Sequence, residues 1–118
     1  MNKLVIEVEV PEQLLKDILV TCVEGGSDYW ATFYKIKREE NLDIISVLVG
    51  TEDDDADTPQ LVHPDKLMNG FENLAKVKDP ENFSDAPNIL HRLLNDVWDA
   101  NDADVLLQLT MFGEVIYG

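Results

Sequence analysis

Acidic side chains offer the most conspicuous chemistry in this chain of 118 residues. Asp53, Asp55 and Asp57 alternate with other residues as at the start of an EF-hand loop, whose carboxylate oxygens bind calcium. That loop requires glycine at its sixth position and glutamate at its twelfth, where this chain has Thr58 and Pro64. The EF-hand pattern therefore fails, and we interpret the segment as a solvated acidic loop.

The nucleophiles and the glycine-rich stretch show no catalytic or phosphate-binding pattern. Cys22 falls on the apolar side of a predicted helix, which is typical of a buried thiol, and His63 and His91 lack metal-binding spacing. The stretch EGGSD, residues 24–28, follows a helix, whereas phosphate-binding loops precede one and use its N-terminus. We therefore predict no catalytic residue, no metal, no cofactor and no enzymatic activity.

The charge balance is unusual, because 24 acidic residues stand against 9 basic ones and give a formal net charge of −15. Such a surface repels nucleic acid and anionic membranes and attracts basic protein surfaces. Two stretches without any base, residues 39–57 and 96–114, hold eight and five of the acids. B-DNA carries one phosphate charge per roughly 1.7 Å of axis, so a protein that mimics it needs dense rows of acids.

We predict that an acidic surface binds a basic surface of a host protein, and that it consists of Glu52, Asp53, Asp54, Asp55, Asp57, Asp99, Asp102 and Asp104. The alternative is that acidity serves solubility and that acids gather at helix N-termini, where the helix dipole favours them. This alternative explains Asp102 and Asp104 well, but it explains the run of acids from 52 to 55 poorly.

Length and composition predict one domain, residues 1–118, with its own hydrophobic core. Apolar residues make up 45% of the chain, which is typical of a globular protein. The first ten residues, MNKLVIEVEV, alternate apolar and charged types instead of forming the apolar run of a signal peptide. We therefore expect a cytoplasmic protein without a membrane partner.

The first half of the chain predicts a strand, a helix and a β-hairpin. Residues 3–10 alternate as in a half-buried strand, and residues 11–24 carry a helical apolar stripe that Gly25 and Gly26 end. Residues 28–37 and 42–50 are rich in aromatic and β-branched residues and predict two paired strands.

The second half predicts three helices after the acidic loop, over residues 63–77, 88–101 and 102–112, the last capped by Gly113. Gly70 lies inside the first of them, where glycine costs about 1 kcal/mol against alanine and indicates close packing. The resulting order is strand, helix, strand, strand and three helices. It predicts an α+β fold with about three strands and the helices packed on one face of the sheet.

Two stretches resemble a family of small, uncharacterised phage and prophage proteins that carry an EGGxxYW element and end in ADVxLQxxxFGEIxYG. The matching residues are Glu24, Gly25, Gly26, Tyr29, Trp30, Ala103, Asp104, Val105, Leu107, Gln108, Phe112, Gly113, Glu114, Tyr117 and Gly118. The resemblance covers about a quarter of the chain and leaves out the acidic loop. It implies an origin in a bacteriophage or mobile element, with action inside a bacterial host cell, and it implies no activity.

Three hypotheses follow. The first is a phage accessory protein that binds and inhibits a host protein, by nucleic-acid mimicry of the anti-restriction or anti-CRISPR kind. The second is a structural or assembly homo-oligomer that pairs through the apolar C-terminal stretch FGEVIYG. The third is a ligand-binding domain around residues 24–30 and 108–114. Glu24 opposes the dipole at a helix C-terminus, so we also expect it to have a partner, such as a backbone amide near residues 113–118.

Overall fold

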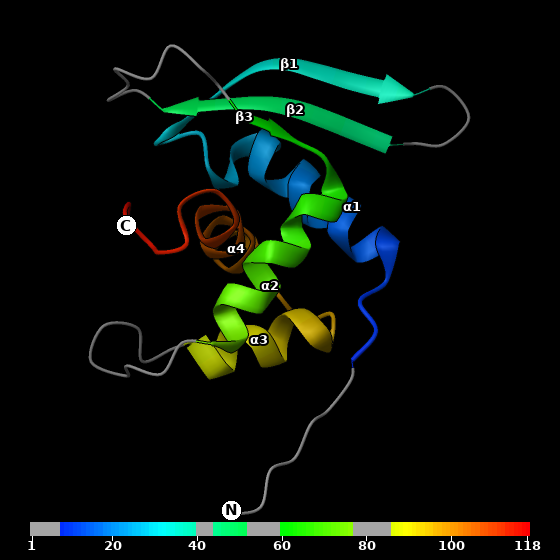
Figure 1. Ribbon diagram of the computed structural model, residues 1–118, viewed down its shortest axis with the longest axis vertical. Coiled ribbons are helices and arrows are strands. Elements are labelled where there is room, and N and C mark those ends of the chain that lie inside the picture. The colour runs from blue at the N-terminus through cyan, green and yellow to red at the C-terminus, as the bar shows by residue number, and fades with distance from the viewer. Residues whose placement is uncertain (1–7, 40–43, 52–59, 77–85) are drawn as a thin grey trace, which may run out of the picture.

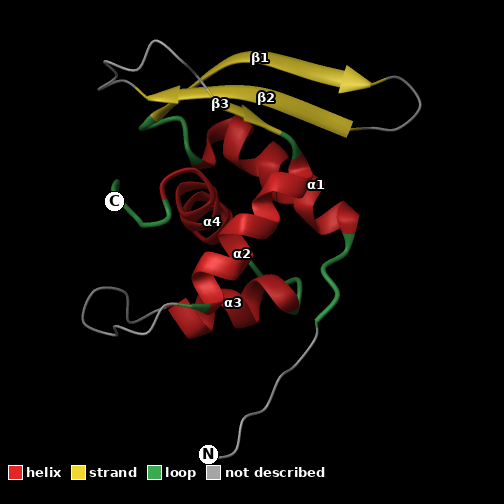
Figure 2. Ribbon diagram, viewed as in Figure 1, coloured by secondary structure: helices red, strands yellow, loops and turns green. Residues whose placement is uncertain are grey.

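The computed structural model describes residues 8–39, 44–51, 60–76 and 86–118, which form a small sheet with helices packed on one of its faces (Figures 1 and 2). The elements in chain order are α1 (Glu12–Thr21), a π-helical turn (Cys22–Gly26), β1 (Ala31–Glu39), β2 (Ile44–Thr51), β3 (Gln60–Val62), a 3-10 turn (Pro64–Lys66), α2 (Leu67–Ala75), α3 (Ala86–Leu94) and α4 (Ala100–Phe112). The predicted α+β class is confirmed. None of the helices within these ranges has the length and apolarity needed to cross a membrane.

The sheet has the order β1-β2-β3, with both pairs of neighbours antiparallel. β1 and β2 form the predicted hairpin, whose register runs from Ala31 opposite Thr51 to Glu39 opposite Ile44. Val47, Val49 and Val62 are buried on the sheet face that the helices cover, which explains why β-branched residues alternate here.

The third strand of the sheet, β3, is not among the strands predicted from the sequence. β3 has only three residues, and so short a strand gives no alternation that a sequence pattern can reveal. The strand predicted over residues 3–10 lies mostly outside the described residues. Its last three, residues 8–10, are described and belong to no strand, and Val8 is 53% exposed.

Helix α1 buries the predicted apolar stripe against the sheet and α4. Leu14, Leu15, Ile18 and Leu19 are all buried, and Cys22 continues the stripe into the π-helical turn. Gly25 then takes φ 145°, a backbone conformation that glycine adopts without steric cost, and the chain turns toward β1. The predicted role of the two glycines in ending this helix is confirmed.

Helix α4 lies at the centre of the helical layer, where it is seen almost end-on with α1, α2 and α3 around it (Figure 1). Its residues 102–110 are all buried, although they include Asp102, Asp104, Gln108 and Thr110. A helix buried on every side cannot leave polar groups unpaired without a large cost. The partners of these polar residues therefore lie inside the protein, and they define the sites below.

Helix α3 ends earlier than predicted. It stops at Leu94, and Asp96 takes φ 57° in the left-handed region, so residues 95–98 form a turn before α4. Asparagine and aspartate adopt this conformation more readily than other non-glycine residues, and the helical apolar spacing of this stretch hid the break. Trp98 consequently packs at the edge of the core from the turn rather than from a helix.

Candidate functional site

Residues 27–30 and residues 104–117, far apart in the sequence, meet in space at the carboxylate of Asp104, on α4. Oδ1 of Asp104 accepts a hydrogen bond from Ser27 Oγ at 2.7 Å and one from Trp30 Nε1 at 2.6 Å. Oδ2 accepts a short hydrogen bond from the Tyr29 hydroxyl and another from Gln108 Nε2 at 3.1 Å. We call these five residues the Asp104 network.

Burial makes the Asp104 network a structural centre of the fold. Asp104 is 3% exposed, and Ser27, Trp30 and Gln108 are equally buried. The donors to Asp104 among the described residues are uncharged, so hydrogen bonds rather than an ion pair compensate the removal of this carboxylate from water. Within the described residues, no buried side-chain nitrogen or oxygen lacks a hydrogen-bond partner.

Tyr29 differs from the rest of the network because its side chain reaches solvent. The residue is 51% exposed, while its hydroxyl points inward to Asp104. Burial of the hydroxyl and the neighbouring Asp104 carboxylate raise the pKa of Tyr29 to about 12. The phenol therefore stays protonated at neutral pH and serves as a hydrogen-bond donor.

Gln108 links the Asp104 network to the C-terminal segment, which we define as residues 114–118. Its Oε1 accepts hydrogen bonds from the backbone N–H groups of Ile116 and Tyr117, both at 2.8 Å, and its Nε2 donates to the Tyr117 carbonyl at 3.0 Å. The Tyr117 ring stacks on Trp30 with 5.3 Å between ring centroids and an interplanar angle of 4°. Phe112 meets both rings edge-on.

The attachment of the C-terminal segment is close to energetic balance. Ordering its backbone costs about 1–2 kcal/mol per residue. Against this stand three hydrogen bonds worth about 0.5–1.5 kcal/mol each, a ring stack of about 0.5–1.5 kcal/mol and the partial burial of one aromatic ring, worth about 1.5–3 kcal/mol. The two sides agree to within a few kcal/mol, so the segment is held by Gln108 and Tyr117 with little surplus.

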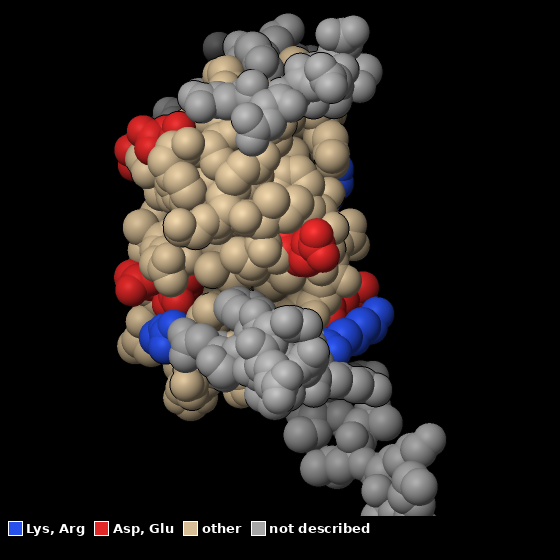
Figure 3. Space-filling view, turned by 90° about the vertical axis from the view of Figure 1, so that its left-hand side faces the viewer, with Lys and Arg blue, Asp and Glu red and all other residues tan. Residues whose placement is uncertain are grey.

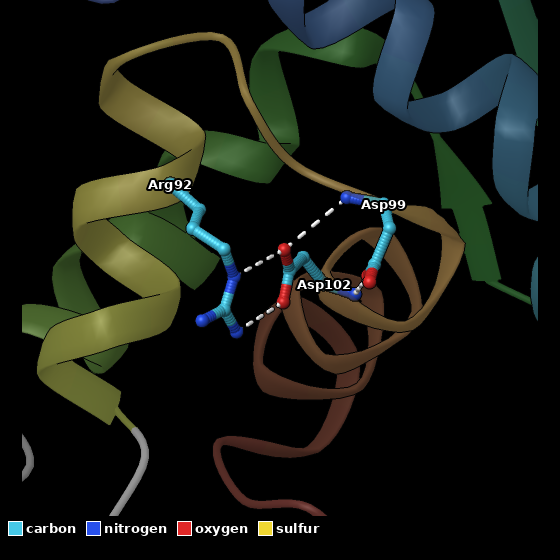
Figure 4. A network of polar contacts seen from close by, with 3 residues as sticks. All are labelled: Arg92, Asp99 and Asp102. Atoms are coloured by element: carbon cyan, nitrogen blue, oxygen red, sulfur yellow. Dashed lines mark hydrogen bonds and ion pairs between the residues drawn. The ribbon is translucent and has the colours of Figure 1, made fainter.

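A second polar network fixes the start of α4 (Figure 4). Arg92 on α3 donates from Nε to Asp102 Oδ2 at 2.8 Å and from its terminal nitrogen to Asp102 Oδ1 at 2.7 Å. Asp99 caps the helix, because its Oδ1 accepts from Asp102 N at 2.9 Å while Asp102 Oδ2 accepts from Asp99 N at 3.2 Å. This capping box and the paired Arg92 neutralise a carboxylate that is fully buried.

The predicted acidic partner-binding surface is therefore wrong at two of its positions. Asp102 and Asp104 are 0% and 3% exposed, because α4 is the central helix and both carboxylates serve the networks inside it. Asp99 is exposed but is committed to capping α4. The remaining members of that surface, Glu52, Asp53, Asp54, Asp55 and Asp57, lie outside the described residues.

Removal of Arg92 is expected to destabilise the protein. The substitution Arg92→Gln leaves the buried Asp102 carboxylate without its bidentate partner, which typically costs 3–5 kcal/mol when one member of a buried pair is lost. Arg92 is 34% exposed, so water can partly replace it, and we expect a loss of about 2–4 kcal/mol in urea unfolding. Lys76→Gln, which changes an exposed base just beyond α2, is the matched control and should stay within about 0.5 kcal/mol. Equal losses for both variants would contradict the assigned role of Arg92.

Cys22 and Ser27, the two nucleophile-type side chains near Asp104, are completely buried. The Cys22 thiol contacts the Ala103 carbonyl at 3.3 Å, and burial raises its pKa to about 12. Neither side chain reaches the surface of the folded protein, which confirms the interpretation of Cys22 as a buried thiol.

We expect Cys22 to resist alkylation in the native protein. At about pH 8 the thiol is almost entirely protonated and sterically shielded, so iodoacetamide should modify it only after unfolding in urea, as mass spectrometry can measure. The folded state holds this proton more tightly than the unfolded state, whose thiol titrates near the ordinary value of 9.0. The associated stability is therefore present below about pH 9 and declines as the pH rises toward 12. Rapid modification without denaturant would contradict the burial of this thiol.

Glu24 lacks the partner that was expected from its place after α1. Its side chain is exposed, and no described residue forms a hydrogen bond or an ion pair with it. The backbone N–H groups of Ile116 and Tyr117 lie in the segment where a partner for Glu24 is predicted, but they donate to Gln108 instead. The element EGGxxYW thus contributes its turn and its two aromatic residues to the site, while Glu24 stays at the surface.

Two further residues of the predicted structural motif, Gly113 and Glu114, follow the end of α4. Gly113 takes φ 74° and caps α4, as predicted, while Glu114 is exposed. The third hypothesis places a ligand-binding domain around residues 24–30 and 108–114. The structure brings these two stretches together; it buries Trp30 and Gln108, while Tyr29 and Glu114 are exposed.

Two contributors to these networks, Ser27 and Arg92, were not predicted as site residues. Asp104 was predicted as a surface acid because charge alone was considered. The spacing of Asp104 and Gln108, four residues apart within the otherwise apolar run ADVLLQL (residues 103–109), was the available signal, because polar residues inside a wholly buried helix need polar partners.

Within the described ranges, no group of three or more histidine, cysteine, aspartate or glutamate side chains is placed to hold a metal ion. Comparison with known proteins gives no further assignment: no protein-family model, no curated protein and no solved structure matches this chain.

Proposed function

We propose that this protein is a small, acidic, non-enzymatic accessory protein of phage origin that binds and inhibits a host protein through a basic surface of that protein. The observation that carries the proposal is the net charge of −15 together with the exposure of the acids. The resemblance of the two stretches to phage and prophage proteins supports the origin and the bacterial cytoplasm as the place of action.

The exposed acids outnumber the bases that accompany them. Ten acidic side chains of the described residues are exposed, namely Glu9, Glu12, Asp17, Glu24, Asp28, Asp65, Glu72, Asp96, Asp99 and Glu114. The bases with described side chains are Lys16, Lys66, Lys76 and Arg92, of which Arg92 is paired with the buried Asp102. This excess of negative charge at the surface favours encounter with a basic partner and disfavours direct binding to nucleic acid.

Nucleic-acid mimicry is the specific mechanism that we propose for the inhibition, and it depends on residues 52–57. On the face shown in Figure 3 the acids of the described residues form separate small groups, with the other residue types between them. A mimic of a DNA strand requires closely spaced negative charges. The run Glu52, Asp53, Asp54, Asp55 and Asp57 supplies such spacing in the sequence, and the two buried acids of α4 are removed from the proposed surface.

The proposal is tested by measuring partner affinity at two salt concentrations. Proteins captured from a bacterial host lysate by the immobilised chain are identified, purified and titrated against it. Raising the salt from about 0.05 to 0.5 M should weaken binding by at least about tenfold, because surface charges are then screened. An affinity that stays unchanged between these concentrations would contradict an electrostatic interaction.

Matched variants separate the acidic loop from the rest of the surface. Replacing Glu52, Asp53, Asp54 and Asp55 with their amides should lower the association rate of the partner and its salt dependence. Amide variants of Glu12, Asp17, Glu72 and Asp96 remove the same charge from the helical layer and its turn. Equal effects of both sets would indicate general attraction and would contradict mimicry by the loop.

A second candidate function, a homo-oligomeric assembly protein, is favoured by exposed apolar side chains in the C-terminal segment. Val115 is 39% exposed and Ile116 is 52% exposed. Apolar side chains of this kind are typical of contacts between subunits. Sedimentation that shows a monomer at micromolar concentration would contradict this candidate and leave the first untouched.

A further inference from the structure

The C-terminal segment is held in the way that a peptide ligand is held by a receptor. Both polar atoms of the Gln108 side-chain amide bind the backbone of the segment, at the N–H groups of Ile116 and Tyr117 and the carbonyl of Tyr117. Contacts to backbone atoms do not depend on side-chain identity. The consecutive N–H groups of Ile116 and Tyr117 meet at one oxygen, as in a backbone turn, so Gln108 specifies a turn of polypeptide rather than one particular sequence.

Specificity for one side chain comes from the aromatic residues. The ring of Tyr117 stacks on Trp30. Phe112 contacts the Tyr117 ring edge-on, with 6.1 Å between the two ring centroids. The preceding side chains, Val115 and Ile116, are largely exposed and add little. The site thus fits a peptide turn whose aromatic residue follows the first bonded N–H group.

The walls of this site are held in place independently of the C-terminal segment. Trp30 is fixed by its hydrogen bond to Asp104 Oδ1, and Gln108 is fixed by its bond to Asp104 Oδ2. Gly113, which joins the segment to α4, takes φ 74°, and a Cβ atom there would meet nothing within 4 Å. The segment can therefore turn away at Gly113 while the site keeps its shape.

We propose that Trp30, Gln108 and Phe112 form a peptide-binding site that the C-terminal segment occupies as an internal ligand. A peptide that forms the same turn and carries an aromatic residue at the position of Tyr117 binds this site when the internal segment is displaced. The near balance between the contacts of the segment and its ordering cost makes displacement accessible under native conditions. This site is separate from the exposed acids, so it stands whether or not the proposed function does.

The test uses the full-length chain and an acetylated hexapeptide with the sequence of residues 113–118, Gly-Glu-Val-Ile-Tyr-Gly. Tyr117→Ala removes the internal ring, so this variant should bind the peptide at least about tenfold more tightly than the unchanged chain, in which the internal segment competes. Binding is measured by calorimetry and by the shift of the Trp30 indole N–H resonance. Val115→Ala, which alters an exposed side chain of the same segment, should not raise the affinity, and a peptide with alanine in place of tyrosine should not bind.

Absence of peptide binding to Tyr117→Ala at millimolar concentration would overturn the proposal. A second measurement needs no variant. In the unchanged chain, the amides of Ile116 and Tyr117 should exchange with deuterium at least about a hundredfold faster than those of Leu106 and Leu107 in the buried part of α4. Exchange of all four amides at one common rate would show that the segment leaves only on global unfolding, and would also overturn the proposal.

Discussion

Replacing Asp104 with alanine is expected to lower the free energy of unfolding by about 3–5 kcal/mol, because buried donors lose their acceptor. Ser27 Oγ and Trp30 Nε1 both donate to Asp104 Oδ1 and are both fully enclosed, so neither can turn to bulk water. Leaving a buried donor unpaired costs about 1–3 kcal/mol for each group. Urea unfolding followed by circular dichroism measures the loss.

The matched control for Asp104→Ala is Asp28→Ala, which removes an exposed acid from the same turn as Ser27 and Tyr29. We expect this variant to stay within about 0.5 kcal/mol of the unchanged chain. A similarly small effect of Asp104→Ala would mean that the carboxylate of Asp104 is solvated, in conflict with its position in the Asp104 network.

Gly70→Ala is expected to destabilise the protein, although the same change in an ordinary helix would stabilise it by about 1 kcal/mol. A Cβ atom at this position would lie 2.3 Å from Thr110 Oγ1 and 2.6 Å from the backbone carbonyl oxygen of Leu106. The carbonyl belongs to the central helix and cannot move without shifting α4 against α2. Overpacking of this kind costs about 1–3 kcal/mol or more, so we expect a net loss of at least about 2 kcal/mol.

Asn69→Ala supplies the control for Gly70→Ala, because it is the adjacent residue of α2 and is exposed. Its effect should be neutral or slightly stabilising, since alanine is the better helix former. Stabilisation by both variants would show that α2 and α4 do not approach as closely as the structure has them. The short distances around Gly70 confirm the sequence-based interpretation of this glycine as a close-packing position.

The parts of the fold that follow from periodic patterns were predictable from sequence. The hairpin of β1 and β2 and the helices α1, α2 and α4 have apolar residues at strand or helix spacing, and the structure contains all of them. The three-residue β3 and the end of α3 were not predictable in this way. β3 depends on pairing with β2, and the break after Leu94 depends on one left-handed residue, Asp96.

The site was predictable only in part, because charge was treated as a property of the surface. Gly25, Gly26 and Gly113 have the structural roles that their types predicted. Asp102 and Asp104 were assigned to a partner surface, whereas the burial of the whole of α4 requires their pairing with Arg92 and with the Asp104 network. Sequence spacing does not reveal a partner such as Ser27, which lies 77 positions from Asp104.

Separating buried from exposed acids sharpens the functional proposal. Two of the acids in the second base-free stretch, Asp102 and Asp104, support the fold, so the proposed binding to a basic partner would depend on exposed acids elsewhere and on residues 52–57. Variants designed to abolish partner binding should therefore leave Asp102 and Asp104 unchanged. Otherwise loss of stability would be mistaken for loss of a binding contact.

A double-mutant cycle measures whether two stretches far apart in the sequence, residues 27–30 and 104–117, form one network around Asp104. Tyr29→Phe removes only the hydroxyl that donates to Asp104, and Asp104→Ala removes the acceptor. We predict that the two changes are coupled by at least about 1 kcal/mol in the free energy of unfolding. Once either partner of this hydrogen bond is removed, removing the other partner breaks no additional bond between them. Effects that add to within about 0.3 kcal/mol would contradict contact between the two stretches at this carboxylate.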